Sequence, residues 1–114
     1  MRQNGAEAER LAQRFLEERG LRLLERNYRC RFGEIDLVMR EGETLVFVEV
    51  RLRTHPGFGG AAASITQAKR ARLLRAARHY LAGLARTPQC RFDAVLLGAD
   101  GAASIEWLRD AFGE

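Results

Sequence analysis

The chain has 114 residues and a formal net charge of +4, with 46% hydrophobic and 30% charged residues. These totals are typical of one globular domain, residues 1–114, that folds without disulfides or structural metals. No apolar run approaches the roughly 18 residues of a membrane span, and the charged first segment lacks the apolar stretch of a signal peptide. We therefore expect a cytoplasmic protein with no membrane partner.

Two cysteines, Cys30 and Cys90, are far apart in the sequence. They lack the close spacing of a zinc site or a redox pair. In a reducing compartment such residues are typically buried free thiols, and this is the prediction for both.

Positive charge is concentrated in one part of the chain. Between Val50 and Phe92 there is no Asp or Glu, whereas the rest of the chain carries more acidic than basic side chains. Such segregation favours a polyanionic partner, but a solvated helix face would give the same pattern. The nine basic residues of this segment are Arg51, Arg53, Lys69, Arg70, Arg72, Arg75, Arg78, Arg86 and Arg91.

The first half of the chain predicts a helix followed by strands. Apolar residues at helical spacing predict a helix over 5–19 that stops at Gly20, and residues 21–30 are predicted to be extended. The segments 33–40 and 44–53 are rich in β-branched residues and flank a short polar turn, which predicts a hairpin. The second of these strands is apolar on both faces, so we expect it to be central in its sheet.

The second half adds a long helix between strands. Residues 54–63 predict a loop, and Ser64 is the expected cap of a helix over 65–86 that ends before Thr87-Pro88. Residues 90–99 predict a strand, and residues 104–112 either a short strand or a terminal helical turn. The strands before and after the long helix can pair in parallel, which gives a single α/β domain.

Acidic residues interrupt the predicted hairpin. Alternation places Glu34, Asp36 and Val38 on one face of the first strand. With a four-residue loop over 41–44, Asp36 would face Glu49 and Glu34 would face Arg51 on the second strand. Two opposed carboxylates repel each other unless one protonates or a cation lies between them.

Two interpretations of these acids remain open. One is a site for a hard divalent cation such as Mg²⁺, which prefers oxygen ligands and typically binds one or two carboxylates. The other is a charge ladder in which Glu34 neutralises Arg51 and Asp36 points outward.

The motifs GEIDLV and FVEVR resemble the acidic core of the PD-(D/E)xK nuclease superfamily. The whole chain resembles the YraN-like family of small bacterial proteins, which share an endonuclease-like fold with archaeal Holliday-junction resolvases. The resemblance includes GAEAERLAQRFLEERG, RNYRCRFGEIDLV, LVFVEVRLR, FGGAAASI, ARHYL and CRFDAVLL. It implies a single restriction-endonuclease-like domain with a central mixed β-sheet flanked by helices.

The resemblance also implies roles for individual residues. Asp36 and Glu49 correspond to metal-binding and catalytic acids for Mg²⁺ or Mn²⁺, and Glu9 corresponds to an acid that completes the metal site in related resolvases. Glu34 is a supporting residue, as an outer ligand or a partner of Arg51. For Glu9, a first-turn acid favoured by the helix dipole is the alternative.

Arg51 departs from the family pattern, because it occupies a position that usually holds a catalytic lysine. Arginine stays protonated in proteins, so it can steady a phosphate but cannot act as a base. Lys69 is a candidate substitute from the following helix. The residues expected to contact the nucleic-acid backbone are Arg53, Lys69, Arg70 and Arg72.

Three functions therefore compete. The first is a metal-dependent nuclease, acting as a hydrolase on structured or branched DNA, with DNA favoured over RNA. The second is a nucleic-acid-binding module of the same fold without activity, and the third is a basic protein that docks on an acidic partner. The related resolvases usually act as dimers, so a homodimer is the candidate assembly for the nuclease.

Overall fold

The computed structural model describes residues 5–52, 66–98 and 101–112. Five strands form one sheet in the order β1-β2-β3-β4-β5, with β3 and β4 parallel and all other neighbours antiparallel. This confirms the predicted mixed α/β domain and the parallel pairing around the long helix. In chain order the elements are α1 (Gly5–Glu17), β1 (Arg22–Cys30), β2 (Gly33–Glu41), β3 (Thr44–Leu52), α2 (Gln67–Ala82), β4 (Cys90–Gly98) and β5 (Gly101–Phe112).

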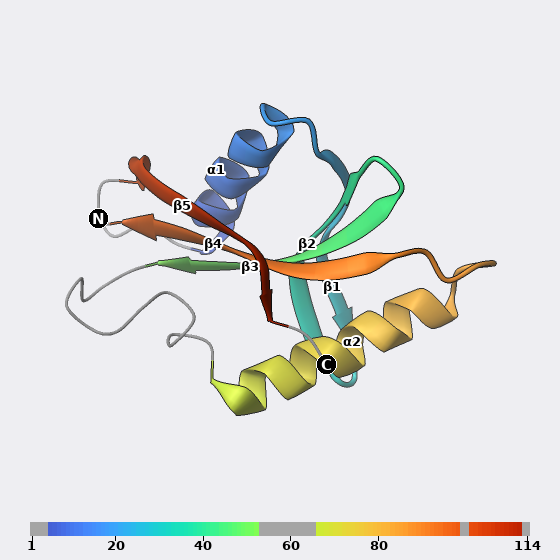
Figure 1. Ribbon diagram of the computed structural model, residues 1–114. Coiled ribbons are helices and arrows are strands. Elements are labelled where there is room, and N and C mark those ends of the chain that lie inside the picture. Colours follow the sequence, from blue (N-terminus) through green and yellow to red (C-terminus); the bar gives the residue numbers. More distant parts are fainter. Residues whose placement is uncertain (1–4, 53–65, 99–100, 113–114) are drawn as a thin grey trace.

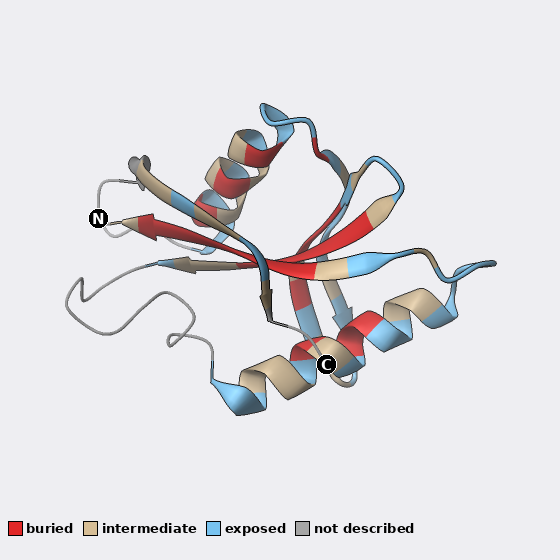
Figure 2. Ribbon diagram, viewed as in Figure 1, coloured by how far each residue is buried: buried red, intermediate tan, exposed pale blue. Residues whose placement is uncertain are grey.

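The two helices cover opposite faces of the sheet, with α1 on one side and α2 on the other (Figure 1). The sheet has a separate apolar cluster on each face, and β3 contributes to both, as expected of a central strand. Buried residues lie in the middle of the sheet and in parts of both helices (Figure 2). In the part of the chain that the structure describes, no helix is long and apolar enough to cross a bilayer. The α1 cluster includes Ala8, Ala12, Leu16, Leu37 and Val48, and the α2 cluster includes Phe47, Leu73, Ala76, Ala77 and Phe92.

A Schellman motif ends α1 and sets the direction of β1. Gly20 has φ +99°, and its N–H donates to the carbonyl of Glu17, while the N–H of Leu21 donates to the carbonyl of Leu16. Leu16 and Leu21 are both buried, which supplies the apolar contact that accompanies this motif. Because a side chain at Gly20 would be strained at this φ, the residue fixes where the helix stops.

Several predicted boundaries differ from the structure. The N-cap of α2 is Thr66, whose hydroxyl accepts from the Lys69 N–H at 3.2 Å. The helix ends at Ala82 with Gly83 as its C-cap, so the predicted range 65–86 is wrong at both ends. The loop 54–63 and Ser64 lie outside the described residues. Residues 101–112 form a strand, which excludes the predicted helical turn. The hairpin turn is shorter than expected, because Glu41 already pairs with Thr44.

The two cysteines form no disulfide with each other, but the prediction that both are buried is wrong. Cys90 is exposed and Cys30 is half-buried. The reason is position: each lies at an end of a strand, beyond the tightly packed middle of the sheet.

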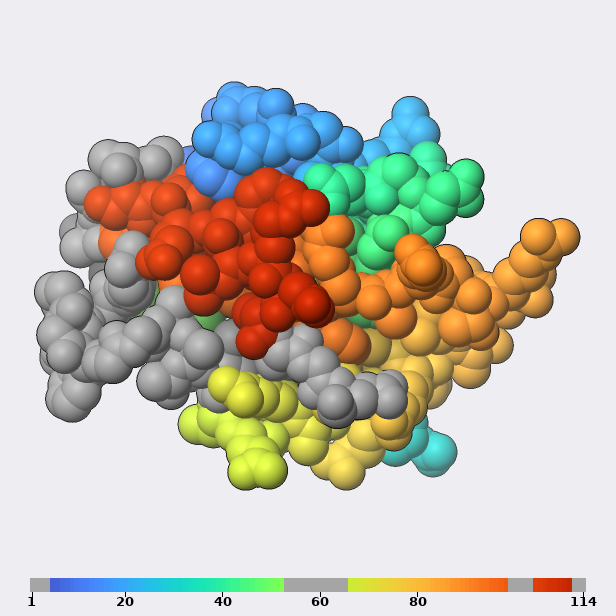
Figure 3. Space-filling model, viewed as in Figure 1, coloured from blue at the N-terminus to red at the C-terminus, as the bar shows by residue number. Residues whose placement is uncertain are grey.

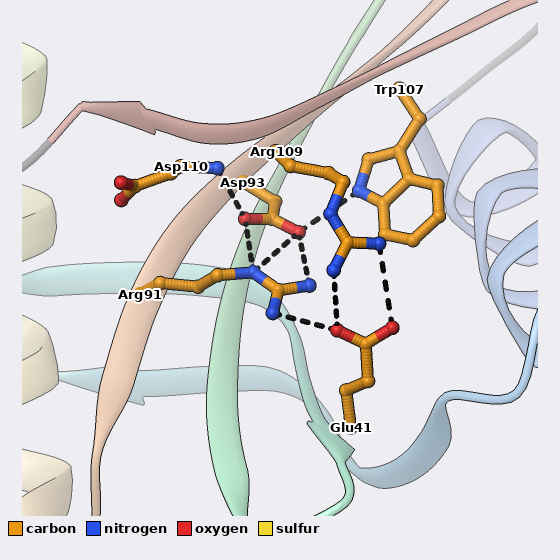
Figure 4. A network of polar contacts seen from close by, with 6 residues as sticks. All are labelled: Glu41, Arg91, Asp93, Trp107, Arg109 and Asp110. Atoms are coloured by element: carbon orange, nitrogen blue, oxygen red, sulfur yellow. Dashed lines mark hydrogen bonds and ion pairs between the residues drawn. The ribbon is translucent and has the colours of Figure 1, made fainter.

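A buried carboxylate joins β4 to β5. Asp93 has no exposed surface and accepts hydrogen bonds from Arg91 (3.0 Å), from Trp107 Nε1 (2.9 Å) and from the backbone N–H of Asp110 (2.8 Å) (Figure 4). The last contact holds Asp110 at a φ of +53°, where the β4–β5 register shifts. Trp107 is half-buried and packs edge-on against Phe15.

The same cluster extends to the end of β2. Glu41 pairs with Arg91 at 2.7 Å and with Arg109 at 2.8 Å, and its hydrogen bond with Arg91 lowers its pKa. Three strands are therefore tied together by one polar network on the α1 side of the sheet (Figure 4).

Asp93→Asn is expected to destabilise the protein by about 2–4 kcal/mol, because it leaves Arg91 beside a neutral amide in a buried position. Glu41→Gln is the matched control: it shares Arg91 as a partner, but the Glu41 side chain is 30% exposed, so we expect a loss of about 1 kcal/mol or less. Urea unfolding monitored by circular dichroism measures both. Equal losses in the two variants would contradict a special role for the buried carboxylate.

Candidate metal and nucleic-acid site

The sheet opens between β2 and β3. Their pairing runs from Glu41–Thr44 through Arg40–Leu45 to Leu37–Val48, although β3 continues to Leu52. The predicted register is therefore confirmed.

Direct pairing of Asp36 with Glu49 was expected beyond this point and is wrong, because the strands separate there. Instead, Asp36 Oδ2 accepts a hydrogen bond of 2.8 Å from the backbone N–H of Val50. The carboxylate thus satisfies a backbone donor that the opening would otherwise leave without a strand partner.

The alternation of β2 is interrupted at Asp36. Ile35 and Val38 both belong to the apolar cluster under α2, whereas Leu37 packs on the α1 side. The opposite position in β1 is Asn27, whose φ is +54° and which falls between the regular pairs on either side. A local irregularity at Asp36 therefore breaks the alternation of side chains between the two faces of β2. The prediction that Glu34, Asp36 and Val38 share one face is wrong.

Glu49 enters the site from the α2 side of the sheet. Its side chain is only 3% exposed, and its Oε2 lies 3.2 Å from Lys69 Nζ and 3.6 Å from Arg51 Nε. Burial raises the pKa of Glu49 to about 7, with a further contribution from the negative charge of Asp36, while Lys69 and Arg51 act in the opposite direction. The lysine that the strand motif lacks is thus delivered to the same carboxylate by the first turn of α2.

Glu9 reaches Asp36 from α1, on the other side of the sheet. The pKa of Glu9 is raised to about 7 by burial first, and also by the charge of Asp36 and a hydrogen bond to its side chain. A hydrogen bond between two carboxyl groups needs one proton, which explains this direction.

Asn27 also hydrogen-bonds Glu9 and lowers its pKa. Sequence reasoning did not identify this residue. The available signal was an asparagine, which tolerates positive φ, inside a stretch that otherwise predicts a strand.

The remaining predicted residues have different positions. Glu34 is exposed and forms an ion pair of 3.2 Å with Arg29, whereas an outer ligand or a partner of Arg51 were the two expected roles. Arg72 is exposed on α2 and Arg70 is half-buried. Arg53 lies outside the described residues. The structure therefore brings together Asp36, Glu49, Glu9, Arg51 and Lys69.

The donor set of this site consists of carboxylate oxygens, which suit Mg²⁺ or Mn²⁺. Within residues 5–52, 66–98 and 101–112, no group of three or more His, Cys, Asp or Glu side chains is arranged to hold a metal ion. One reason is that Glu49 is turned toward Lys69 and Arg51. A site for Mg²⁺ needs only one or two carboxylates, since water and phosphate oxygens usually complete its shell.

Comparison with known proteins identifies the family. Residues 8–97 match the family described as "Uncharacterised protein family UPF0102", which is the YraN family. The chain belongs to UPF0102. It is 61% identical to a UPF0102 protein of Nitrosomonas europaea over 96% of this chain and 93% of that protein. It is 59% identical to a UPF0102 protein of Nitrosospira multiformis, over 98% and 94% of the two chains.

The UPF0102 match confirms the resemblance found in the sequence. The sheet with its two flanking helices is consistent with the endonuclease-like fold that this resemblance implied. The matched range includes Glu9, Asp36, Glu49, Arg51 and Lys69, which are the residues that meet at the opening of the sheet.

In the metal-free protein, the free energy of unfolding is expected to fall as the pH rises from about 5 to about 7. The folded protein holds protons on Glu9 and Glu49, with pKa values of about 7, that the unfolded chain, with values of 4.5, has released. Asp36→Asn removes one cause of both shifts, so this slope should become shallower. Urea unfolding across the pH range measures it.

Glu43→Gln is the control, because it removes one negative charge from an exposed position in the hairpin turn. Its pH slope should match that of the unmodified protein. A slope unchanged in Asp36→Asn would show that the three acids do not interact.

Proposed function

We propose that this UPF0102 protein is a metal-dependent nuclease that binds and hydrolyses structured or branched DNA. The observation that carries the proposal is the meeting of Asp36, Glu49 and Glu9 where β2 and β3 separate, with Lys69 and Arg51 at Glu49. Acidic groups with raised pKa values beside cationic side chains are typical of catalytic sites. The family match and the endonuclease-like fold are compatible with this chemistry.

The charge of the site supports a divalent cation. Two glutamates have pKa values near 7 because burial and Asp36 disfavour further negative charge, and a cation would relieve that repulsion. Asp36 and Glu49 would hold Mg²⁺ or Mn²⁺, with Glu9 as the third acid. When bound, the ion would polarise the scissile phosphate and lower the pKa of a coordinated water.

Arg51 and Lys69 would together perform the two roles that related nucleases assign to one catalytic lysine, which are stabilising the phosphate and activating water. Arg51 remains protonated and can offset negative charge on the phosphate in the transition state. Lys69 can lose a proton, so it can position or activate the attacking water from the start of α2. Their shared contact with Glu49 holds both cations at the site before DNA binds.

The second candidate is a DNA-binding module of the same fold without hydrolytic activity. The contacts of Glu49 with Lys69 and Arg51 favour it, because these cations already neutralise the carboxylate without a metal. An arginine also occupies the position that usually holds a lysine. In that case the cations stabilise the buried acid and bind the DNA backbone, and no metal is needed.

The first test is cleavage of a branched DNA with Mg²⁺ or Mn²⁺. We expect activity that is lost on chelation and reduced at least about 10³-fold in Asp36→Ala and Glu49→Ala, with DNA binding retained. Binding without cleavage by any preparation would favour the second candidate. Binding that is absent or insensitive to salt would contradict both and would favour an acidic protein partner, because phosphate contacts release counterions.

A second test separates the two cations. Lys69→Arg keeps a positive charge near Glu49 but removes a group that can deprotonate, so cleavage should fall about 10²-fold or more while DNA affinity changes less than about twofold. Arg51→Lys is the matched control and should retain cleavage. Full activity in Lys69→Arg would assign Lys69 a purely electrostatic role.

A further inference from the structure

The turn between β1 and β2 lies against the side of α2. Gly33, which starts β2, has φ +147°, and an added Cβ there would lie 3.5 Å from the Cβ of Arg72. In the space-filling view this turn emerges at the lower edge of the molecule next to α2 (Figure 3). Arg31 and Phe32 at the tip of the turn therefore share a surface with the exposed side of the helix.

Aromatic contacts fix the position of this turn. Phe32 packs edge-on against His79 of α2 at 5.9 Å, and the hydroxyl of Tyr28 is hydrogen-bonded to Nδ1 of His79. Tyr28 in turn meets Tyr80, which reaches Phe47 in the core. The chain of rings thus runs from the buried centre of the sheet to the half-buried Phe32 at the tip of the turn, and it holds that ring in one place.

The surroundings of Phe32 are basic. The guanidinium of Arg31 lies over its ring at 4.9 Å, and Arg72 and Arg75 are exposed on the neighbouring helix. The sequence of α2 contains no Asp or Glu, and Glu34 beside the turn is paired with Arg29. An aromatic ring among arginines suits a nucleic-acid base, which can stack on the ring while the arginines contact phosphates.

The surface is next to the acidic site. Gly33 is three residues before Asp36 on β2, which corresponds to roughly 10 Å along a strand. On α2, Arg72 is about one turn after Lys69, which contacts Glu49. A single strand that passes the carboxylates would therefore reach Phe32 within a few nucleotides.

We infer that Phe32, with Arg31, Arg72 and Arg75, forms a stacking platform for an unpaired nucleotide of the DNA substrate. The inference rests on the proposed nucleic-acid function and specifies its substrate: DNA with a single-stranded segment or a splayed arm next to the bound phosphate. Perfectly paired duplex cannot offer a free base to the ring, so the platform discriminates between the two forms.

The experiment measures affinity of the full chain for a flapped DNA and for a blunt duplex of the same length, by fluorescence anisotropy. Phe32→Ala should weaken flap binding at least about fivefold and leave duplex binding within about twofold. Phe32→Trp keeps a stacking ring and should restore flap affinity, with quenching of the new indole fluorescence on binding. Leu24→Ala, an exposed apolar residue at the other end of β1, is the control and should change neither.

The charges are tested separately. The double variant Arg72→Gln/Arg75→Gln should weaken both DNAs and lower the salt slope by about 0.7–0.9 for each phosphate that the protein no longer neutralises. Arg22→Gln/Arg40→Gln removes the same charge from exposed positions paired across β1 and β2 and should have a small effect.

The outcomes distinguish the platform from the function. The platform would be overturned, and DNA binding left intact, if Phe32→Ala weakened flap and duplex binding equally. The same would follow if Phe32→Ala weakened neither DNA while Arg72→Gln/Arg75→Gln still weakened both. No salt-dependent binding of either DNA would overturn both.

Discussion

The candidate site depends on one hydrogen bond, from the Val50 N–H to the carboxylate of Asp36. A sheet can open between two strands only if the backbone donors exposed by the opening find other partners. Asp36 is such a partner, and its acceptance of this bond places a negative charge at the point where β2 and β3 separate. Glu9 from one face and Glu49 from the other can then approach the same carboxylate, because no continuous ladder stands between them.

This arrangement carries an electrostatic cost that the rest of the molecule offsets. Burial disfavours the charged form of Glu49, and Lys69 and Arg51 oppose that effect. Functional sites commonly contain buried ionic groups that lower the stability of the folded protein. Asp93 shows the contrasting solution: it is fully buried, but it accepts hydrogen bonds from three residues and joins β4 to β5 (Figure 4).

The sequence predicted the elements and register well because hydrophobic alternation and the short turn constrain them strongly. Val38 opposite Phe47 follows directly from that pattern. The irregularity at Asn27 and Asp36 was not predictable in the same way. It changes which face of the sheet the β2 side chains point to, and it depends on a positive φ at Asn27 that hydrophobic alternation does not encode. Lys69 was a candidate from its position on α2, but its contact with Glu49 depends on where the helix begins, and Thr66 rather than Ser64 determines that.

The strands lie in the sheet in the order in which they occur in the chain, and this has a kinetic consequence. The strands of the meander β1–β2–β3 are joined by short connections, so its formation loses little loop-closure entropy. The parallel contact between β3 and β4 must wait for the crossover that includes α2. Since that crossover also delivers Lys69, we expect the meander to assemble first and the buried Glu49 to gain its lysine only as folding is completed.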